Sequence, residues 1–375
     1  MLQLLKIFQA PSKAYQNSTV RRSNAVQPAR HWALFNGCDE QLGNNVKCLL
    51  HTEITINSSV SPLTAILTLN MMYRMKFYIL FLFLSLVSPF SQSKEIAITF
   101  DDSPRKALGY FNGPDRAKKL VEELKNHNVE QVAFFSNTKG LNDEGIQRLK
   151  TYSDAGHIIA NHTHSHPNFN DTSLEEFVQD FLLADSKLSQ YKNFTKLFRF
   201  PYLREGDDEQ KRDGMREALN EHGYTNAYIT LNNYDWHIEN MFQDALRNEF
   251  VLDFDLLRQF YVQVMMESIE YYDEMAQTHL GRSPKHILLL HELDISALYI
   301  GDLVDQLRSK GWKIISPEEA YTDELVEYQA KQTFRFNPGR IGEIAASKGQ
   351  EKGLWHETLD KKYLDDRFFN EVLNP

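Results

Sequence analysis

Short apolar runs alternate with amphipathic stretches from about Lys94 to Ser316. A short apolar run bounded by turn residues is typical of a buried strand, whereas apolar residues three and four positions apart are typical of a helix. Regular alternation of the two predicts repeated β/α units, and therefore a parallel sheet covered by helices.

The same pattern gives the expected bounds of the elements. Strands are predicted at Glu95–Phe100, Val129–Phe135, His157–Ala160, Leu197–Tyr202, Tyr224–Thr230, His286–His291 and Trp312–Ser316. Helices are predicted from Pro114 to Leu124, at Glu144–Ser153, from a Thr172–Glu175 capping box to about Gln190, and at Gln210–Glu221 and Ala297–Ser309. Phe250–His279 is long and apolar at helical spacing, which predicts an extra helix or a helical hairpin.

The region before the first predicted strand has a different character. From Met75, the basic Lys76 is followed by the apolar run Phe77–Val87 and then by small and polar residues. This layout is typical of a secretory signal peptide, here 75–93, and the run is shorter than the roughly 20 residues that span a bilayer. A buried core helix is the alternative interpretation of the run.

A signal peptide should open a chain, yet 74 residues precede Met75. We interpret residues 1–74 as translated upstream sequence or a disordered extension, and Met71, Met72 or Met75 as the natural start. The alternative is a genuine N-terminal extension with an internal membrane anchor. We expect the mature protein to be secreted or periplasmic without a stable membrane span, or membrane-anchored if the signal is not cleaved.

Composition narrows the possible partners. The net charge of −10 argues against a nucleic-acid partner, which normally requires a basic face. The only two cysteines, Cys38 and Cys48, lie in the first 70 residues, so a disulfide framework is excluded for the main domain.

Polar clusters follow several predicted strands, where β/α folds build their sites. Asp101 and Asp102 stand together in the Thr99–Pro104 segment, and they should point in opposite directions while the strand lasts. Alone, such a pair is more often a solvated turn.

A second cluster, Asn161–His166, contains three histidines. His162 and His166 are four residues apart, which would place both imidazoles on one side of a helical turn, where they could share a cation, while His164 points elsewhere. Zinc prefers nitrogen ligands, and a carboxylate as third ligand leaves one position open for water. A polar surface loop is the alternative.

Three further clusters contain Arg199, Asp235–Trp236 and His291. An arginine forks onto carboxylates and could lower the pKa of a neighbouring aspartate. Taken singly, the ordinary interpretations are a surface ion pair, an exposed loop and a core histidine.

Together and in this order, the five clusters resemble the motifs of the polysaccharide deacetylase family, the NodB-homology or family 4 carbohydrate esterases. Its TFDDGP, HTxxH, RxPY, DxxDW-like and LxxH-like motifs are recognisable within residues 94–316. The resemblance implies a distorted (β/α) barrel with fewer than eight strands, here 94–320 with a helical insertion at 238–285. A helical or irregular extension would follow at 321–375, with Trp355, Phe368 and Phe369 as anchors.

The family's roles transfer residue by residue. Asp102, His162 and His166 would be the metal ligands, usually for zinc and sometimes for cobalt or nickel. Asp101 would be the general base, oriented by Arg199, and His291 the general acid, tuned by Asp235. The Tyr202 backbone N–H would bind the oxyanion, and Leu289 and Trp236 would line the pocket for the acetyl methyl group.

The chain departs from the family pattern at three places. Ser103 replaces the usual glycine, Asn232 replaces the first aspartate of the fourth motif, and the insertion is longer than usual. The insertion leaves the substrate class open.

The resemblance implies a metal-dependent hydrolase that removes N-acetyl groups from a chitin-, peptidoglycan- or poly-N-acetylglucosamine-like polysaccharide and releases acetate. We expect a monomer. The alternatives are a catalytically silent carbohydrate- or metal-binding relative and an O-acetyl xylan esterase of the same family. A glycosidase ranks last, because its two carboxylates would have to flank a sugar bond.

Overall fold

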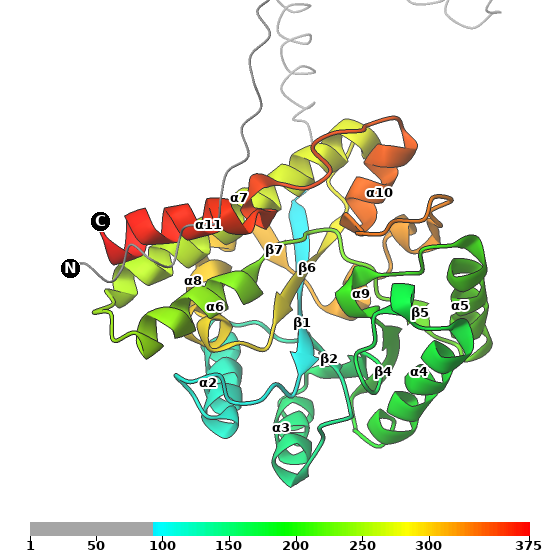
Figure 1. Ribbon diagram of the computed structural model, residues 1–375, viewed down its shortest axis with the longest axis horizontal. Helices are drawn as coiled ribbons and strands as arrows, with labels where there is room; N and C mark the ends of the chain where they lie inside the picture. The colour runs from blue at the N-terminus through cyan, green and yellow to red at the C-terminus, as the bar shows by residue number, and fades with distance from the viewer. Residues whose placement is uncertain (1–92) are drawn as a thin grey trace, which may run out of the picture. The chain divides into compact units, whose positions relative to one another are not determined.

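The structure is a computed structural model that describes residues 93–375, so residues 1–74 and nearly all of the expected signal peptide lie outside the described part. Its strands are β1 (Lys94–Ser103), β2 (Ala133–Ser136), β3 (Ile158–Asn161), β4 (Phe194–Phe198), β5 (Thr225–Asn226), β6 (Lys285–His291) and β7 (Trp312–Ile314). All pair in parallel in the order β5-β4-β3-β2-β1-β6, and β7 pairs with the start of β1. Figure 1 shows helices arranged in a ring around these strands.

The segment after β5 brings the two ends of this sheet together. The Ala227 N–H donates to Phe198 O of β4, and the Thr230 and Leu231 N–H groups donate to Ile287 O of β6. Leu231 also forms a parallel bridge with Leu288. This segment thus joins β4 and β6, and the predicted distorted (β/α) barrel with fewer than eight strands is confirmed.

The surrounding helices follow the predicted order. They are α2 (Gly113–Asn126), α3 (Asp143–Asp154), α4 (Leu174–Leu188), α5 (Glu209–Glu221), α6 (Asp235–Arg247), α7 (Phe254–Leu280), α8 (Asp294–Ser309), α9 (Pro317–Ala320), α10 (Gly339–Ser347) and α11 (Lys361–Phe368). Short 3₁₀ segments occur at Phe169–Asp171, Pro201–Leu203, Glu324–Glu327 and Glu357–Leu359, and a π turn occurs at Phe369–Leu373.

Three predicted strands differ most from the observed ones, and the first of them, β2, begins at Ala133 rather than at Val129. β4 ends at Phe198 rather than Tyr202, because Pro201 has no N–H to donate and Tyr202 has a left-handed backbone with φ of 57°. In Tyr224–Thr230 only β5 is regular strand.

The predicted capping box is wrong by one residue. Ser173, not Thr172, caps α4, and Glu176 is its reciprocal partner. The Thr172 hydroxyl instead donates to Asn168 O.

The region between the fourth and fifth motifs folds as α6 and one long helix, α7, so of the two alternatives predicted for Phe250–His279 the extra helix is confirmed and the hairpin is not. α7 buries residues such as Phe260, Val264 and Ile269 along its length. Although α7 has 27 residues, no helix within residues 93–375 is both long and apolar enough to cross a bilayer.

The C-terminal segment packs on the barrel through α10 and α11, shown in orange and red in Figure 1. Of its three expected anchors only Phe368 is buried, and its ring lies 5.5 Å from that of Phe260. Trp355 and Phe369 are 43% and 53% exposed, so their role as anchors was predicted wrongly.

A buried ionic cluster fastens α7 to the amino ends of β1 and β6. Asp273 lies 3.2 Å from His286 Nε2 and 2.6 Å from Lys94 Nζ, and its side chain is fully buried. Burial raises the pKa of Asp273, but hydrogen bonds from His286 and Lys94 outweigh it and hold the pKa well below its usual range.

We therefore expect Asp273→Ala to lower the free energy of unfolding by about 2 kcal/mol, because it leaves the buried His286 imidazole without a hydrogen-bond partner at Nε2. Urea unfolding followed by circular dichroism measures the change. Asp305→Ala is the matched control, since it breaks the His127–Asp305 pair, in which Asp305 is 62% exposed. Equal effects of the two substitutions would contradict the prediction.

Candidate active site

The polar residues that follow the strands meet at the carboxyl end of the barrel. Asp101 and Asp102 lie in the last part of β1, His162 follows β3, Arg199 follows β4 and His291 ends β6. In a parallel sheet these strand ends open on the same face. The register pairs Asp101 directly with His291.

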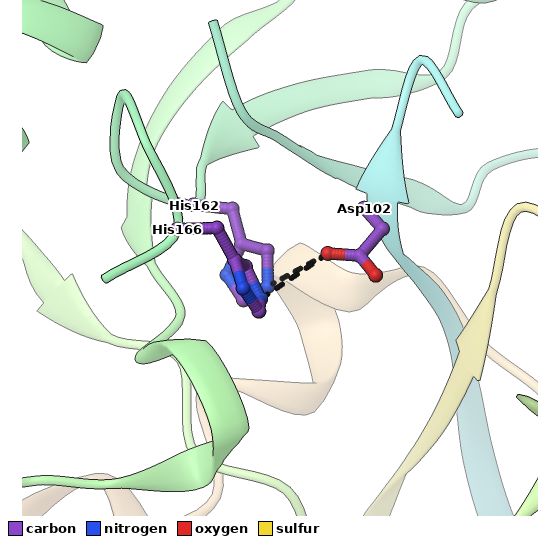
Figure 2. A group of neighbouring side chains, drawn as sticks. All are labelled: Asp102, His162 and His166. Carbon is purple, nitrogen blue, oxygen red and sulfur yellow. Dashed lines mark ion pairs between the residues drawn. The ribbon is translucent and has the colours of Figure 1, made fainter. Parts of the chain in front are cut away.

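Asp102, His162 and His166 form a group able to hold a cation (Figure 2). One ligand atom from each lies within 4.8 Å of the others. Asp102 Oδ1 is 3.7 Å from His162 Nε2 and 3.2 Å from His166 Nε2. Two imidazole nitrogens and one carboxylate oxygen are a donor set that suits zinc and leaves a coordination position for water.

The histidines meet in a turn rather than in the expected helical turn. The Thr163 N–H donates to Asn161 Oδ1, and the His166 N–H donates to Thr163 Oγ1. Thr163 and His166 are left-handed, with φ of 67° and 57°. As expected, His164 lies outside the group, and its Nδ1 is 2.7 Å from Thr138 Oγ1.

The two aspartates do not point in opposite directions, contrary to the expectation from strand alternation. Asp101 Oδ2 and Asp102 Oδ1 are 3.8 and 3.7 Å from the same atom, His162 Nε2. Asp102 has a φ of 65°, and the pairing of β1 with β2 shifts register just there. The break in regular strand geometry turns both carboxylates toward one imidazole.

Asp101 is paired with Arg199 in the interior of the barrel. Arg199 Nη1 donates to Asp101 Oδ1 at 3.0 Å, and both side chains are buried. Burial raises the pKa of Asp101 to about 6, against the opposing attraction of Arg199 and His291. The carboxylate is therefore ionised at neutral pH and a stronger base than an exposed aspartate.

His291 is held by Asp235, the first residue of α6. Asp235 accepts hydrogen bonds at 2.7 Å from both the His291 N–H and the His291 ring Nδ1. Burial lowers the pKa of His291, but Asp235 outweighs it and raises the pKa to about 9. The Nδ1–H group of the imidazolium donates a hydrogen bond to Asp235. The Nε2–H group is therefore the one left to act as an acid.

Unlike His291, the two histidines among the cation-binding candidates are neutral, and the third candidate, Asp102, is ionised. Burial lowers the pKa of His162 and of His166 to about 4, so both rings are neutral and offer a lone pair. Burial raises the pKa of Asp102, but His291 and the other nearby imidazoles outweigh it and lower the pKa to about 2. One carboxylate with two neutral imidazoles therefore fits a divalent cation.

The three candidates for substrate contact differ in position. The Tyr202 ring lies 4.5 Å from that of His166, which places Tyr202 at the edge of the cation-binding group. Leu289 is buried on β6, two residues before His291 and so on the same face. The Trp236 ring lies 4.9 Å from that of Tyr234 and has Lys361 of α11 over it.

Sequence reasoning missed the residues that support these groups. Arg105 Nη1 donates to Asp102 Oδ2 at 2.7 Å, and Arg199 Nη2 donates to the Tyr321 hydroxyl at 3.2 Å. Arg105 stands three residues after Asp102, so its position was a usable signal. Tyr321 gave no such signal, because it lies 122 residues from Arg199.

A buried ionic network, also missed, supports the loops after β1 and β6. Glu292, next to His291, accepts from the Arg105 N–H at 2.7 Å, from Arg148 at 3.1 Å and from Arg116 at 3.2 Å. Arg116 also donates to Asp294 at 2.9 Å. These bonds fix the backbone that carries Arg105 and the segment that follows His291.

Glu239 extends this network along α6. It accepts from the Ile295 N–H at 2.8 Å and from Gln243 at 2.7 Å, and it is 2% exposed. Burial raises the pKa of Glu239 to about 7, with a further contribution from Asp294.

Comparison with known proteins identifies relatives of the first half of this domain. Residues 91–227 match the model of the family described as polysaccharide deacetylase. The chain is 31% identical over 122 residues to a peptidoglycan-N-acetylglucosamine deacetylase of Bacillus cereus, and the aligned segment covers 31% of this chain and 43% of that protein. It is 31% identical over 150 residues to the peptidoglycan-N-acetylmuramic acid deacetylase PdaA of Bacillus subtilis, covering 40% of this chain and 52% of PdaA. The chain therefore spans about half the length of these curated relatives.

Solved structures give weaker similarity. A structure described as T48 deacetylase with substrate has a TM-score of 0.42 and 19% identity, covering 62% of this chain and 92% of the other. The peptidoglycan N-acetylglucosamine deacetylase Bc1960 has a TM-score of 0.43 and 20% identity, covering 62% and 89%. A pseudoenzyme of carbohydrate esterase family 4, with a TM-score of 0.44 and 17% identity, covers 61% and 66%.

The pKa of Glu239 predicts a pH-dependent stability. Because the pKa rises from 4.5 to about 7 on folding, folding favours the protonated acid. That contribution is complete below pH 4.5 and is lost as the pH rises through 7. The free energy of unfolding of the wild type should therefore fall relative to Glu239→Gln, by up to about 1.4 kcal/mol per pH unit, and the difference should level off above pH 7.

Urea unfolding at several pH values from 4.5 to 8 measures this difference. Glu122→Gln on α2 is the control, because the Glu122 side chain is 55% exposed and this substitution removes a carboxyl group that folding leaves at the surface. A constant difference between wild type and Glu239→Gln across this range would show that the Glu239 pKa is not raised.

Proposed function

We propose, from the premise that this chain carries a domain of the polysaccharide deacetylase family, that it is a hydrolase that removes N-acetyl groups from a polysaccharide and releases acetate. One observation carries the proposal. A possible cation site, Asp102–His162–His166, lies beside a carboxylate paired with Arg199 and an imidazolium paired with Asp235. Amide hydrolysis is helped when a Lewis acid that polarises the carbonyl, a general base and a general acid lie at one place.

The donor set supports a bound divalent cation, most simply zinc, with cobalt or nickel as alternatives. When bound there, such an ion polarises the amide carbonyl and makes water a nucleophile near neutral pH. Asp102, His162 and His166 would hold it, and Arg105 would fix the second oxygen of Asp102.

The chain's own groups would move the protons. Asp101 removes a proton from the attacking water, while Arg199 keeps the carboxylate ionised and oriented. The Tyr202 N–H would stabilise the oxyanion. His291 then donates its Nε2 proton to the leaving amine, since its Nδ1 proton is held by Asp235.

The remaining candidates would shape the substrate pocket. Leu289, beside His291, is placed to contact the acetyl methyl group. Trp236 is the weaker candidate, because its described contacts are with Tyr234, His237 and Lys361.

Both curated relatives are named for peptidoglycan, so we propose a peptidoglycan-type glycan as the first substrate to test. Chitin-like polymers, poly-N-acetylglucosamine and acetylated xylan form the rest of the substrate panel. A silent carbohydrate- or metal-binding protein is the second candidate, and wild-type acetate release discriminates between the two.

Two neighbouring aspartates should separate cation binding from catalysis. Asp102→Ala removes a ligand, so cation content and acetate release should fall together. Asp101→Asn keeps the ligand set, so the cation should stay bound while kcat falls on the order of 10²- to 10⁴-fold, and His291→Ala should behave likewise. Metal analysis beside acetate release on each purified variant measures both properties.

His164→Ala is the control, because His164 lies outside the group and should leave both properties unchanged. A chelator should abolish wild-type activity, and added zinc or cobalt should restore it. If Asp101→Asn loses the cation or keeps near-normal turnover, the division of roles within the aspartate pair is wrong.

We also propose that the protein is exported through the signal-like segment 75–93. Mass spectrometry of the native protein should find a mature N-terminus near Ser93, and a form starting at Lys94 should be active because the candidate site residues lie downstream. Recovery of peptides covering residues 3–70 from the mature protein would contradict this.

A further inference from the structure

An outward strip of aromatic rings and guanidinium groups begins beside His166; it consists of Tyr202, Arg204, Phe336 and Arg335. Arg204 Cζ lies 5.6 Å from the centre of the Tyr202 ring and 5.3 Å from that of Phe336. Arg335 Cζ lies 5.9 Å from the centre of the same Phe336 ring. Because Tyr202 also contacts His166, the strip continues outward from the candidate active site.

The rings of this strip face water. Tyr202 is 58% and Phe336 61% exposed, among the most exposed large aromatic side chains within residues 93–375. Exposed aromatic surface rimmed by polar groups is typical of a binding site. Aromatic rings with one apolar face and polar neighbours suit a ligand that has both C–H faces and hydroxyl groups, as a sugar ring does.

The two arginines of the strip differ from the other arginines that the structure describes. Within residues 93–375, every other arginine forms a side-chain hydrogen bond or ion pair, whereas the guanidinium groups of Arg204 and Arg335 form none with the described residues. This occurs in a chain with a net charge of −10. The nearby acidic groups are engaged elsewhere, since Glu205 accepts from Asn226 and Asp207 pairs with Lys211.

The segment that carries Phe336 is fastened on both sides. Before it, Arg216 donates to Ala330 O at 2.9 Å, and Asn170 donates to Arg335 O at 3.2 Å. After it, the Arg340 N–H donates to Ile229 O at 2.8 Å. The backbone that carries this exposed ring is therefore held in place on both sides, which favours a preorganised contact.

We propose that the outward strip is a glycan subsite that binds a saccharide unit next to the one being deacetylated and recognises a carboxylate on it. The rings of Tyr202 and Phe336 would stack on the sugar. The free edges of the Arg204 and Arg335 guanidinium groups would accept a carboxylate in a forked hydrogen bond. A saccharide of the N-acetylmuramic acid type has this chemistry. The inference rests on the proposed function and specifies its substrate as a carboxylate-bearing glycan.

Binding of two tetrasaccharides tests the subsite. One is the neutral N-acetylglucosamine tetramer, and the other alternates N-acetylglucosamine with N-acetylmuramic acid and has free carboxylates. Calorimetry on full-length protein treated with a chelator gives Kd without turnover. The variants are Phe336→Ala and Arg204→Gln, and the controls are Phe369→Ala and Arg247→Gln, whose parent side chains are 53% and 61% exposed.

Phe336→Ala should raise Kd for both tetrasaccharides about tenfold, because stacking is common to both. Arg204→Gln should raise Kd about tenfold for the acidic tetrasaccharide and less than about twofold for the neutral one. The controls should leave both Kd values unchanged, and all four variants should keep the melting temperature of the wild type.

The outcomes separate this inference from the proposed function. Unchanged Kd for both Phe336→Ala and Arg204→Gln overturns the subsite, even if the wild type releases acetate when zinc is restored. Equal losses on the two tetrasaccharides in Arg204→Gln overturn the recognition of a carboxylate. If the substitutions raise Kd as expected but the wild type releases no acetate, the subsite is supported and the proposed deacetylase activity is contradicted.

Discussion

The ion pair between Arg199 and Asp101 crosses the interior of the barrel, from the end of β4 to the end of β1. A buried guanidinium is tolerated only when its N–H groups are satisfied, and Arg199 donates also to Ala227 O, Thr99 Oγ1 and the Tyr321 hydroxyl. One side chain thus ties together two strands, the segment that closes the barrel and the start of the C-terminal extension. Because Asp102 follows Asp101 directly, the same pair determines where the candidate cation site can form.

The backbone around this pair is strained in the same region. Among the non-glycine residues with left-handed φ values are Asp102, Thr163, His166 and Tyr202, which all lie at the ends of β1, β3 and β4. Each such conformation costs on the order of 1–3 kcal/mol and persists where surrounding contacts impose it. The Asn161 and Thr163 side chains supply such contacts in the histidine turn. The strain places side chains that regular strands or helices would separate.

The sequence could predict the features that local pattern determines, and it could not predict those that depend on backbone strain or on long-range contacts. The β/α alternation, and the positions of Asp101, His162 and Arg199 at strand ends, follow from local pattern and were predicted. The common direction of Asp101 and Asp102 was not, because alternation assumes a regular strand and φ at Asp102 is 65°. Supporting contacts such as the bond from the Arg105 N–H to Glu292, 187 residues apart, exist only after folding and have no local signal.

The segment that matches the family model ends at residue 227, and it lacks part of the candidate machinery. Asp235 and His291 lie beyond it, as does Tyr321, and each reaches the site through contacts with the matched segment or its barrel. Leu231 and Leu288 close the barrel from outside the match as well. The same later region supplies Phe336, which meets Arg204 of the matched segment at the surface. Both the proposed general acid and the proposed glycan subsite would therefore depend on residues 228–375. These residues meet the proposed base and cation ligands of the first half only because the barrel closes.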